Sequence, residues 1–192
     1  GARLGVAWAG SPTELSSHPV GLVLVDERDR MVKSAGDEGD PALIAYARAT
    51  NYRGKMMGIA SSPTIEGESP IMAWFERGTM MRWCFSCPEC ACWFAPESSM
   101  LKWDKEGSIE RRAKSARVEC PACSFAIRTE HRGTIGRPGI IDMGWRPYRV
   151  NEVGRYVPAD EVTESSIASY WVSGLASPWR TFESIARLLL IA

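Results

Sequence analysis

The sequence contains no Gly-x-x-x-x-Gly-Lys-Ser/Thr loop, the motif that cradles the phosphates of bound nucleotides in a large class of hydrolases. A complete nucleotide site of that class is therefore excluded from these 192 residues. The sequence also has no apolar run near the roughly 18 residues that a membrane span requires. It shows no secretory leader pattern, so we expect a protein that has no membrane partner and stays in a cytoplasm.

An excess of charge of one sign is also missing. The 23 basic and 23 acidic side chains cancel, so no global field indicates a nucleic-acid partner. The chain is long enough for one large or two small domains, and its 45% hydrophobic and 24% charged residues are typical of globular proteins. It starts with Gly1 and ends in a nearly all-apolar stretch, residues 186–192, so we expect it to continue at both ends in a longer protein.

Two adjacent carboxylates follow an apolar run near the start of the chain. Residues 21–25 read Gly-Leu-Val-Leu-Val, as in a buried strand, and Asp26 and Glu27 come directly after them. Ligands of open α/β sheets bind at the carboxyl ends of the strands. ATP-hydrolysing proteins place one carboxylate there to hold Mg²⁺ and a second to orient or deprotonate the attacking water. The pattern recurs at residues 56–60, which precede Ser-Ser-Pro-Thr at 61–64, so the two runs predict half of a nucleotide-hydrolysing site.

The order of the expected elements indicates an α/β fold. Alternating strands and helices in the first part predict a parallel sheet with right-handed crossovers, a partial P-loop-NTPase-like sheet. Three segments follow from the change in composition: a partial ATPase core at 1–81, a cysteine-containing module at 82–138, and a return to the core at 139–192. The expected strands are 3–8, 20–25, 56–60 and 145–150, and the expected helices are 12–17, 41–51, 69–78, 159–164 and one from 179.

The cysteines have the spacing of a metal site. Cys87-Pro-Glu-Cys90 and Cys120-Pro-Ala-Cys123 are the same Cys-Pro-x-Cys device. Two residues between cysteines let a tight turn direct both thiolates at one tetrahedral Zn²⁺, and two such knuckles close a Cys₄ site. With no open coordination position, such a zinc holds structure and does no chemistry. Buried free thiols are the alternative, although they would not explain two matching knuckles.

Three nearby residues could be mistaken for further ligands. We expect Cys84 and Cys92 to pack as small hydrophobic residues, because free cysteines are among the most buried residue types. We expect His131 to be a surface histidine. Elsewhere, Asp29, Glu38 and Asp40 are expected to serve solvation and helix capping rather than catalysis.

Several motifs follow one another along the chain in a specific order. They are Ser11-Pro12, Leu15-x-Ser17-x-Pro19-Val20, Val23-Leu24-Val25-Asp26-Glu27-Arg28-Asp29, Glu38-Gly39-Asp40-Pro41, Ser62-Pro63-Thr64-Ile65-Glu66-Gly67 with Ser69, the two Cys-Pro-x-Cys knuckles, and Gly174-Leu175-x-Ser177-Pro178-Trp179. In this order they resemble the lambda-type phage terminase large subunit, the ATP-driven motor that packages viral DNA into proheads. The resemblance covers nearly all of the 192 residues, as the second half of the ATPase region with a zinc-ribbon insertion. Two positions depart from the family's pattern: Arg28 stands where an apolar residue is usual, and Pro70 stands where a basic residue is usual.

The resemblance implies roles for particular residues. Asp26 would be the Mg²⁺-associated Walker B aspartate and Glu27 the catalytic glutamate. Ser61, Ser62 and Thr64 would form the coupling motif that senses the γ-phosphate of ATP and relays hydrolysis to DNA movement. The implied cofactors are Mg²⁺ and ATP in the intact protein, beside the structural Zn²⁺. The phosphate loop and a nuclease domain would lie outside these residues, so the chain alone is not expected to turn over ATP.

The resemblance also implies partners: double-stranded DNA, the terminase small subunit, the portal, and further copies of the same subunit in the working motor. The place of action would be the cytoplasm of the bacterial host. Two other readings remain open. One is a zinc-ribbon module that binds nucleic acid or protein without ATPase activity, and the other is a helicase-like DNA-dependent ATPase outside phages.

One basic cluster lies between the two knuckles. Arg111, Arg112, Lys114 and Arg117 place four cations in seven residues. Such a run is usually a solvated face. The functional alternative is contact with DNA phosphates on the zinc module, where cations gain free energy by releasing counterions and position the DNA without reading its sequence.

Overall fold

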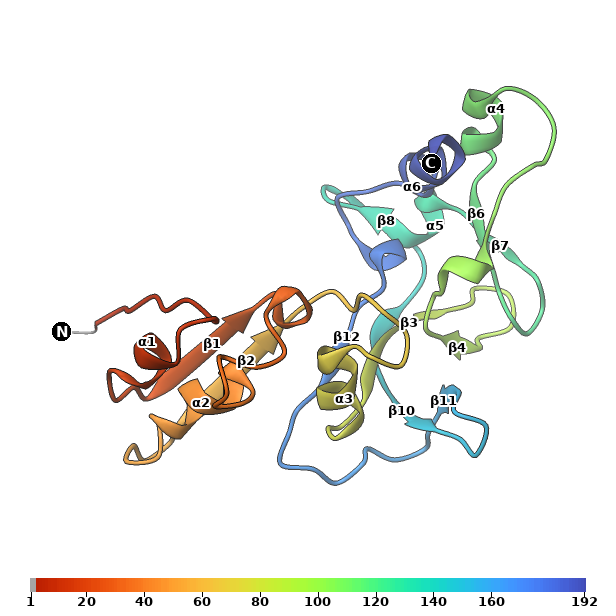
Figure 1. Cartoon of the computed structure of the whole chain (residues 1–192). Helices are drawn as coiled ribbons and strands as arrows, with labels where there is room; N and C mark the ends of the chain where they lie inside the picture. Colours follow the sequence, from red (N-terminus) through yellow and green to blue (C-terminus); the bar gives the residue numbers. More distant parts are fainter. Residues whose placement is uncertain (1–2) are drawn as a thin grey trace. The chain divides into compact units, whose positions relative to one another are not determined.

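The structure, a computed structural model, describes residues 3–192 and divides the chain into two compact units (Figure 1). The first unit extends to Trp74 and the second begins at Phe75, so the boundary falls inside helix α3 (Pro70–Glu76). The finer division into segments 1–81, 82–138 and 139–192 stays a prediction.

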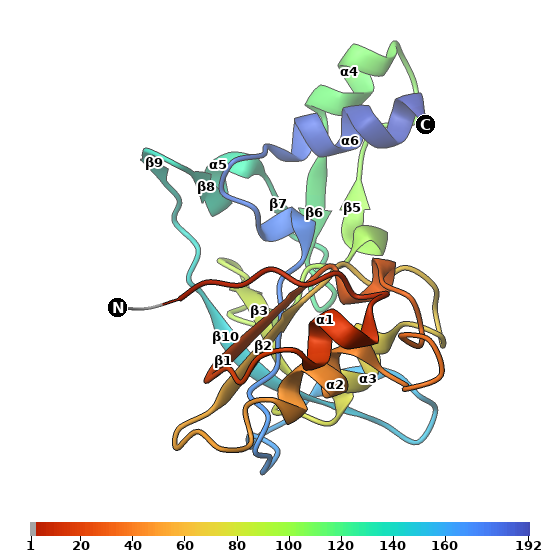
Figure 2. The ribbon, with the colours of Figure 1, turned by 60° about the vertical axis from the view of Figure 1, so that its left-hand side comes forward.

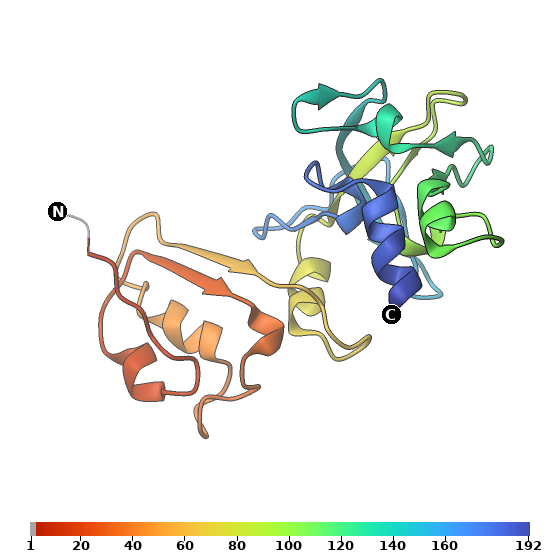
Figure 3. The same cartoon turned by 90° about the horizontal axis from the view of Figure 1, so that it is seen from above.

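The first unit is built on a two-stranded parallel sheet. Strand β1 (Leu22–Asp26) pairs with β2 (Met56–Ala60) in a register that sets Asp26 opposite Ala60. Helices α1 (Pro12–Ser16) and α2 (Pro41–Ala47) lie on one side of this sheet (Figure 3). The parallel pairing agrees with the α/β prediction, but the larger P-loop-like sheet is not confirmed, because within the described part of this unit only these two strands pair.

The core of the first unit is small and one-sided. Val23 and Val25 point inward from β1 and pack against Ala42 of α2. The alternate residues Leu22 and Leu24 are 49% and 74% exposed. This period of two is the ordinary consequence of the strand's pleat, which turns successive side chains to opposite faces.

Helix caps fix the starts of α1 and α2 as the sequence predicts. The Ser11 side chain accepts a hydrogen bond from the Glu14 amide, and Pro12 occupies the first helical turn. The Asp40 side chain likewise accepts a hydrogen bond from the Ala42 amide, and Pro41 occupies the first turn of α2. Helix α2 ends at Ala47, four residues before the predicted end.

The strand predicted at residues 3–8 is wrong. The segment is irregular, and its apolar residues Leu4 and Val6 are 90% and 94% exposed. An alternating apolar pattern becomes a strand only where a neighbouring strand accepts and donates its backbone hydrogen bonds. None of the described strands pairs with this segment.

The second unit is built mostly from short strands. Its largest sheet has the order β11-β10-β3-β12, with β4 also paired to β3, and a second sheet has the order β5-β6-β7. The strands are β3 (Met81–Ser86), β4 (Trp93–Phe94), β5 (Leu101–Lys102), β6 (Arg117–Glu119), β7 (Ala126–Ile127), β8 (Gly133–Thr134), β9 (Arg137–Pro138), β10 (Met143–Val150), β11 (Tyr156–Pro158) and β12 (Tyr170–Trp171).

Three helices belong to the second unit. Helix α6 (Phe182–Ile191) packs beside α4 (Ile109–Lys114), as Figure 2 shows, and α5 (Thr129–Arg132) precedes the β8–β9 hairpin. The terminal helix is therefore formed, and it begins after the Thr181 cap. Single 3₁₀ turns are η1 (Arg28–Arg30), η2 (Ser98–Met100) and η3 (Gly174–Ala176).

The helix predicted at residues 159–164 is wrong, since the segment is irregular. Residues 160–164 are all exposed, so the segment has no apolar face to bury, and short helices in water depend on such burial.

A buried arginine, Arg132, holds the segment that precedes α6. Arg132 is 2% exposed, and its guanidinium donates to the backbone carbonyls of Leu175 at 2.6 Å, of Ser177 at 2.7 Å, and of Arg180. Its guanidinium also lies over the Phe182 ring. The cation thus gives three carbonyl groups of this irregular segment a donor, and the Ser177 carbonyl also accepts from the Arg180 amide.

None of the helices formed by residues 3–192 is long and apolar enough to cross a membrane.

Candidate functional site

The predicted carboxylate pair lies at the carboxyl edge of the parallel sheet. Asp26 ends β1 opposite Ala60, so Ser61 lies one step beyond Ala60 beside the pair. The side chains of Asp26 and Glu27 are both exposed, as groups that meet a soluble ligand must be. The structure therefore brings Asp26, Glu27 and Ser61 to one sheet edge, where α/β sheets bind their ligands.

Glu27 has an unusual backbone conformation. Its φ of 52° and ψ of 49° lie in the left-handed region, which side chains other than glycine adopt at a cost. The turn is held by a 2.8 Å hydrogen bond from the Arg30 amide to the Glu27 carbonyl. Strained backbone of this kind concentrates at functional sites, where surrounding contacts impose it.

Asp29 ties this turn to the segment that follows β2. Its amide donates to the Ser61 hydroxyl oxygen at 2.9 Å. Its carboxylate accepts from the Thr64 amide at 3.1 Å and from the Ile71 amide at 2.9 Å. The sequence assigned Asp29 to solvation or capping, and the Ile71 contact is a cap for α3, although one made across 42 residues. The connection between the two loops has no local sequence signal.

The environment of Asp29 favours its charged form. Partial burial raises the pKa of the carboxyl group, but hydrogen bonds from the Ser69 side chain, the Ile71 amide and the Thr64 amide and hydroxyl together lower the pKa below its usual 3.8. A carboxylate that accepts backbone amides is stabilised as the anion. Asp29 is therefore a fixed negative charge at neutral pH.

Arg28 is accommodated by an ion pair. It is 3% exposed, and its Nη2 atom donates to Oδ2 of Asp40 at 2.9 Å, while the Nε and Nη1 atoms have no hydrogen-bond partner among the described residues. Asp40 thus neutralises a buried cation and caps α2 with its other oxygen. This pairing explains how an arginine can occupy a position where the resemblance leads one to expect an apolar residue.

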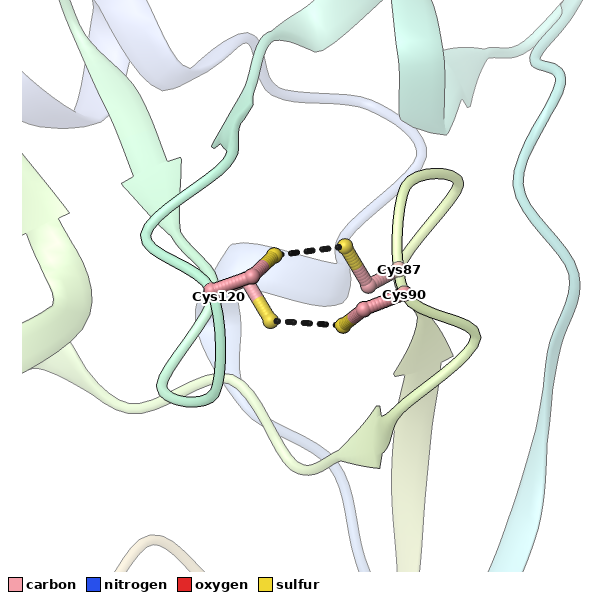
Figure 4. A group of neighbouring side chains, drawn as sticks. Cys87, Cys90 and Cys120 are labelled. Atoms are coloured by element: carbon pink, nitrogen blue, oxygen red, sulfur yellow. Dashed lines mark hydrogen bonds between the residues drawn. The ribbon is translucent and has the colours of Figure 1, made fainter.

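The four predicted metal ligands come together in the second unit. The sulfur atoms of Cys87, Cys90, Cys120 and Cys123 all lie within 4.8 Å of one another. The Cys87–Cys123 and Cys90–Cys120 sulfur pairs are 3.6 and 3.7 Å apart, and Figure 4 marks these contacts with dashed lines. A tetrahedral Zn²⁺ with Zn–S bonds of about 2.3 Å requires sulfur separations of roughly 3.8 Å. Two of the sulfur separations are close to this value, and all four thiols are near enough to one another to hold a single metal ion.

The two knuckles repeat the same backbone hydrogen bonds. In the first, the Cys87 amide donates to the Cys92 carbonyl and the Cys87 carbonyl accepts from the Ala91 amide, both at 2.9 Å. In the second, Cys120 makes the equivalent bonds with the Phe125 carbonyl at 3.0 Å and the Ser124 amide at 2.9 Å.

The residue after each second cysteine is also left-handed, with φ of 57° at Ala91 and 60° at Ser124. Two unrelated segments that adopt one strained turn point to a shared purpose, the presentation of two thiols to a single centre.

Crowding of the thiols disfavours a cluster of four free anions. A backbone hydrogen bond from Phe125 lowers the pKa of Cys123, but burial and the three neighbouring thiols outweigh it and raise the pKa to about 12. The pKa of Cys120 is lowered, since backbone and thiol hydrogen bonds outweigh burial. A divalent cation at the centre would remove the repulsion, because thiolates that coordinate a metal are deprotonated outright.

The three neighbouring residues lie outside this cluster. Cys84 is fully buried with its sulfur 3.9 Å from the Tyr148 hydroxyl, and Cys92 is half-buried beside the knuckle. The Nδ1 atom of His131 accepts a hydrogen bond from the Arg128 amide at 3.1 Å.

Comparison with known families decides the membership of the chain. Residues 1–145 match the sequence model of the family described as phage terminase large subunit gpA, ATPase domain. The chain belongs to this family. No curated protein and no solved structure matches the sequence of this chain.

Members of the terminase ATPase family share a known chemistry. Members take part in ATP hydrolysis and viral DNA packaging, which makes DNA and the packaging machinery their partners. The match spans β1, β2 and both cysteine knuckles, so the sheet edge and the Cys₄ cluster both fall within the family's domain.

The basic cluster is only partly free to meet DNA. Arg117 forms ion pairs with Asp104 at 3.1 Å and Glu119 at 3.3 Å. Arg111 and Lys114 are exposed on α4, and Arg112 is half-buried. Contact with DNA stays a prediction for this cluster of Arg111, Arg112, Lys114 and Arg117. Because Arg117 is engaged in ion pairs, Arg111 and Lys114 are the cations best placed to meet a phosphate.

Proposed function

We propose that this chain supplies the magnesium and water-activating side of the ATP site in a phage DNA-packaging motor. Asp26 would hold Mg²⁺, and Glu27 would orient or deprotonate the attacking water. The observation that carries the proposal is the parallel register, which sets both carboxylates beside Ser61 at one sheet edge in a chain of the terminase ATPase family. Ser61, Ser62 and Thr64 would sense the γ-phosphate from the end of β2.

The Cys₄ cluster has a structural role in this proposal. Cys87, Cys90, Cys120 and Cys123 would hold one Zn²⁺ that closes the short strands of the second unit around a common point. The matching distances and repeated turns support zinc, and four protein ligands leave no position for a substrate.

The working protein would be a complete large subunit, in which this chain is joined to a phosphate-binding loop and a nuclease domain. Its partners would be double-stranded DNA, the terminase small subunit, the portal and other copies of itself, in the cytoplasm of the bacterial host. The chain alone would hydrolyse ATP at the background rate, because no lysine or backbone cradle holds the β- and γ-phosphates. The family membership supports this assignment.

The experiment is Glu27→Gln in the complete large subunit. Glutamine keeps the shape and removes the charge, so turnover should fall to background while ATP binding remains within a few-fold of the parent. Glu38→Gln is the matched control, because Glu38 is an exposed carboxylate of the same β1–α2 connection. Turnover that survives in the Glu27 variant would remove Glu27 from the catalytic role.

A further inference from the structure

Asp29 connects two segments that the proposed ATP site needs in fixed relation. It lies two residues after Glu27 in the turn η1. It contacts Ser61 and Thr64 within the 61–69 loop, the connection between β2 and α3, and Ile71 just beyond that loop. At the near end the Asp29 amide bonds to Ser61, and at the far end its carboxylate bonds to Ile71 in the first turn of α3.

The three contacts restrain different groups. The amide of Asp29 fixes the Ser61 hydroxyl, one carboxylate oxygen receives the Thr64 amide, and the other receives the Ile71 amide. Thr64 adds a longer bond from its hydroxyl at 3.4 Å. A charged acceptor roughly doubles the strength of such bonds compared with neutral pairs. One residue thereby holds the loop at Ser61 and Thr64 and the first turn of α3 at Ile71.

The turn that carries Asp29 is itself rigid. The left-handed Glu27 and the hydrogen bond from Arg30 back to Glu27 leave the two residues between them little freedom. Arg28 is anchored by its buried ion pair with Asp40. Any shift of α3 must therefore break the bonds of Asp29 or move Glu27 with it.

We propose that Asp29 is a positioning residue that keeps Glu27 in register with the 61–69 loop and the start of α3. This inference rests on the proposed ATP hydrolysis and adds a route by which a change at the site of hydrolysis would reach helix α3. Helix α3 continues past Trp74 into the second unit, where β3 leads directly to the first cysteine knuckle. A change at the γ-phosphate that alters Glu27 would reach α3 through Asp29 in one step.

The first test reads structure in the chain itself. Asp29→Ala should accelerate amide hydrogen exchange at Thr64 and Ile71 by about tenfold or more, because both amides lose their acceptor. Asp29→Asn keeps one carbonyl acceptor and should release only one of the two amides. Asp37→Ala is the control, since Asp37 is an exposed carboxylate of the same connection and makes no hydrogen bond within residues 3–192. Unchanged exchange in a folded Asp29→Ala protein would overturn the proposal.

The second test reads catalysis in the complete large subunit. Asp29→Ala should lower kcat for ATP by about tenfold or more and leave KM within about threefold, because it misplaces the water-orienting group without touching the nucleotide. Asp29→Asn should recover part of kcat, and Asp37→Ala should match the parent. Faster exchange with unchanged kcat would overturn the positioning role. Should Asp29→Ala fail to fold, the kcat and exchange of the Asn variant decide.

The two proposals fail in different ways. If Glu27→Gln retains turnover, the proposed catalytic role is wrong whatever Asp29 does. If Glu27→Gln is inactive and both Asp29 variants match the parent in kcat, the catalytic role stands and the positioning role falls.

Discussion

At the scale of single residues, the site is marked by a backbone conformation. Glu27 occupies the left-handed region directly after β1, and the same region is used at both cysteine knuckles. Glycine would adopt this conformation without the steric cost of roughly 1–2 kcal/mol that a side chain incurs. Glu27 therefore holds this conformation at a steric cost that a glycine at the same position would not incur.

We predict an inverted order of stability for substitutions at position 27. Glu27→Gly should be more stable than Glu27→Ala by about 1 kcal/mol, because alanine keeps the left-handed strain and glycine relieves it. At Glu38, whose φ is not positive, the order should be the normal one, with alanine above glycine. Urea unfolding of the four variants measures this, and a Glu27→Ala protein as stable as the glycine variant would contradict it.

The lowered pKa of Asp29 predicts a pH-dependent contribution to stability. Because the folded pKa lies below the unfolded value of 3.8, the charged form stabilises the fold fully above that value. This contribution should disappear as the pH falls through the folded pKa. The difference in unfolding free energy between the parent and Asp29→Asn should thus be present at pH 6 and shrink toward pH 3. A difference that grows on acidification would show that the pKa is raised instead.

At the scale of secondary-structure elements, Asp40 has two tasks. It caps α2 through the Ala42 amide and neutralises the buried Arg28. Asp40→Ala should therefore destabilise the first unit by on the order of 3 kcal/mol, since a lost cap costs about 1 and a buried charge without its partner costs more. Glu38→Ala, two residues earlier and exposed, should change stability little. Chemical unfolding of both variants compares them, and equal effects would mean that Arg28 finds another partner.

The cysteine knuckles predict one tightly held zinc. Replacing any one of Cys87, Cys90, Cys120 or Cys123 by Ser should release the metal and unfold the region around the knuckles, because metal binding and folding are one free-energy event in such sites. Cys92→Ser is the matched control and should retain zinc, since Cys92 lies beside the cluster without joining it. Elemental analysis of protein purified without chelator decides, and less than about half an equivalent of zinc in the parent would refute a Cys₄ zinc site.

Local signals predicted the elements that depend on local chemistry. The Ser11 and Asp40 caps located α1 and α2, and the apolar run at 56–60 located β2 because strand pairing with β1 uses those same residues. The prediction of a strand at 3–8 was wrong because a strand there requires a partner strand, which the local pattern does not encode. Asp29 was underestimated for the same reason, since its partner Ile71 lies 42 residues away.

At the scale of the whole molecule, the zero net charge of these 192 residues bears on any test of DNA binding. These residues contribute no diffuse attraction, so their share of a salt dependence must come from local groups such as Arg111 and Lys114. In the complete large subunit, Arg111→Ala with Lys114→Ala should flatten the slope of log affinity against log salt by roughly 0.9 for each lost phosphate contact. Arg117→Ala should do less, because Arg117 is engaged by two carboxylates. A slope that is unaltered in the double variant would make α4 a solvated face.

The knuckles give their proposed metal two inner and two outer sulfurs. Cys87 and Cys120 are buried, whereas Cys90 and Cys123 are exposed. Electrophiles and oxidants in solution would therefore reach Cys90 and Cys123 first, and oxidation of either would release the metal, as its replacement by Ser would. Oxidation to the sulfenic state is reversible, so thiols could restore the lost ligand and the metal could bind again. The asymmetry of exposure means that loss of the metal would begin at the outer pair of sulfurs.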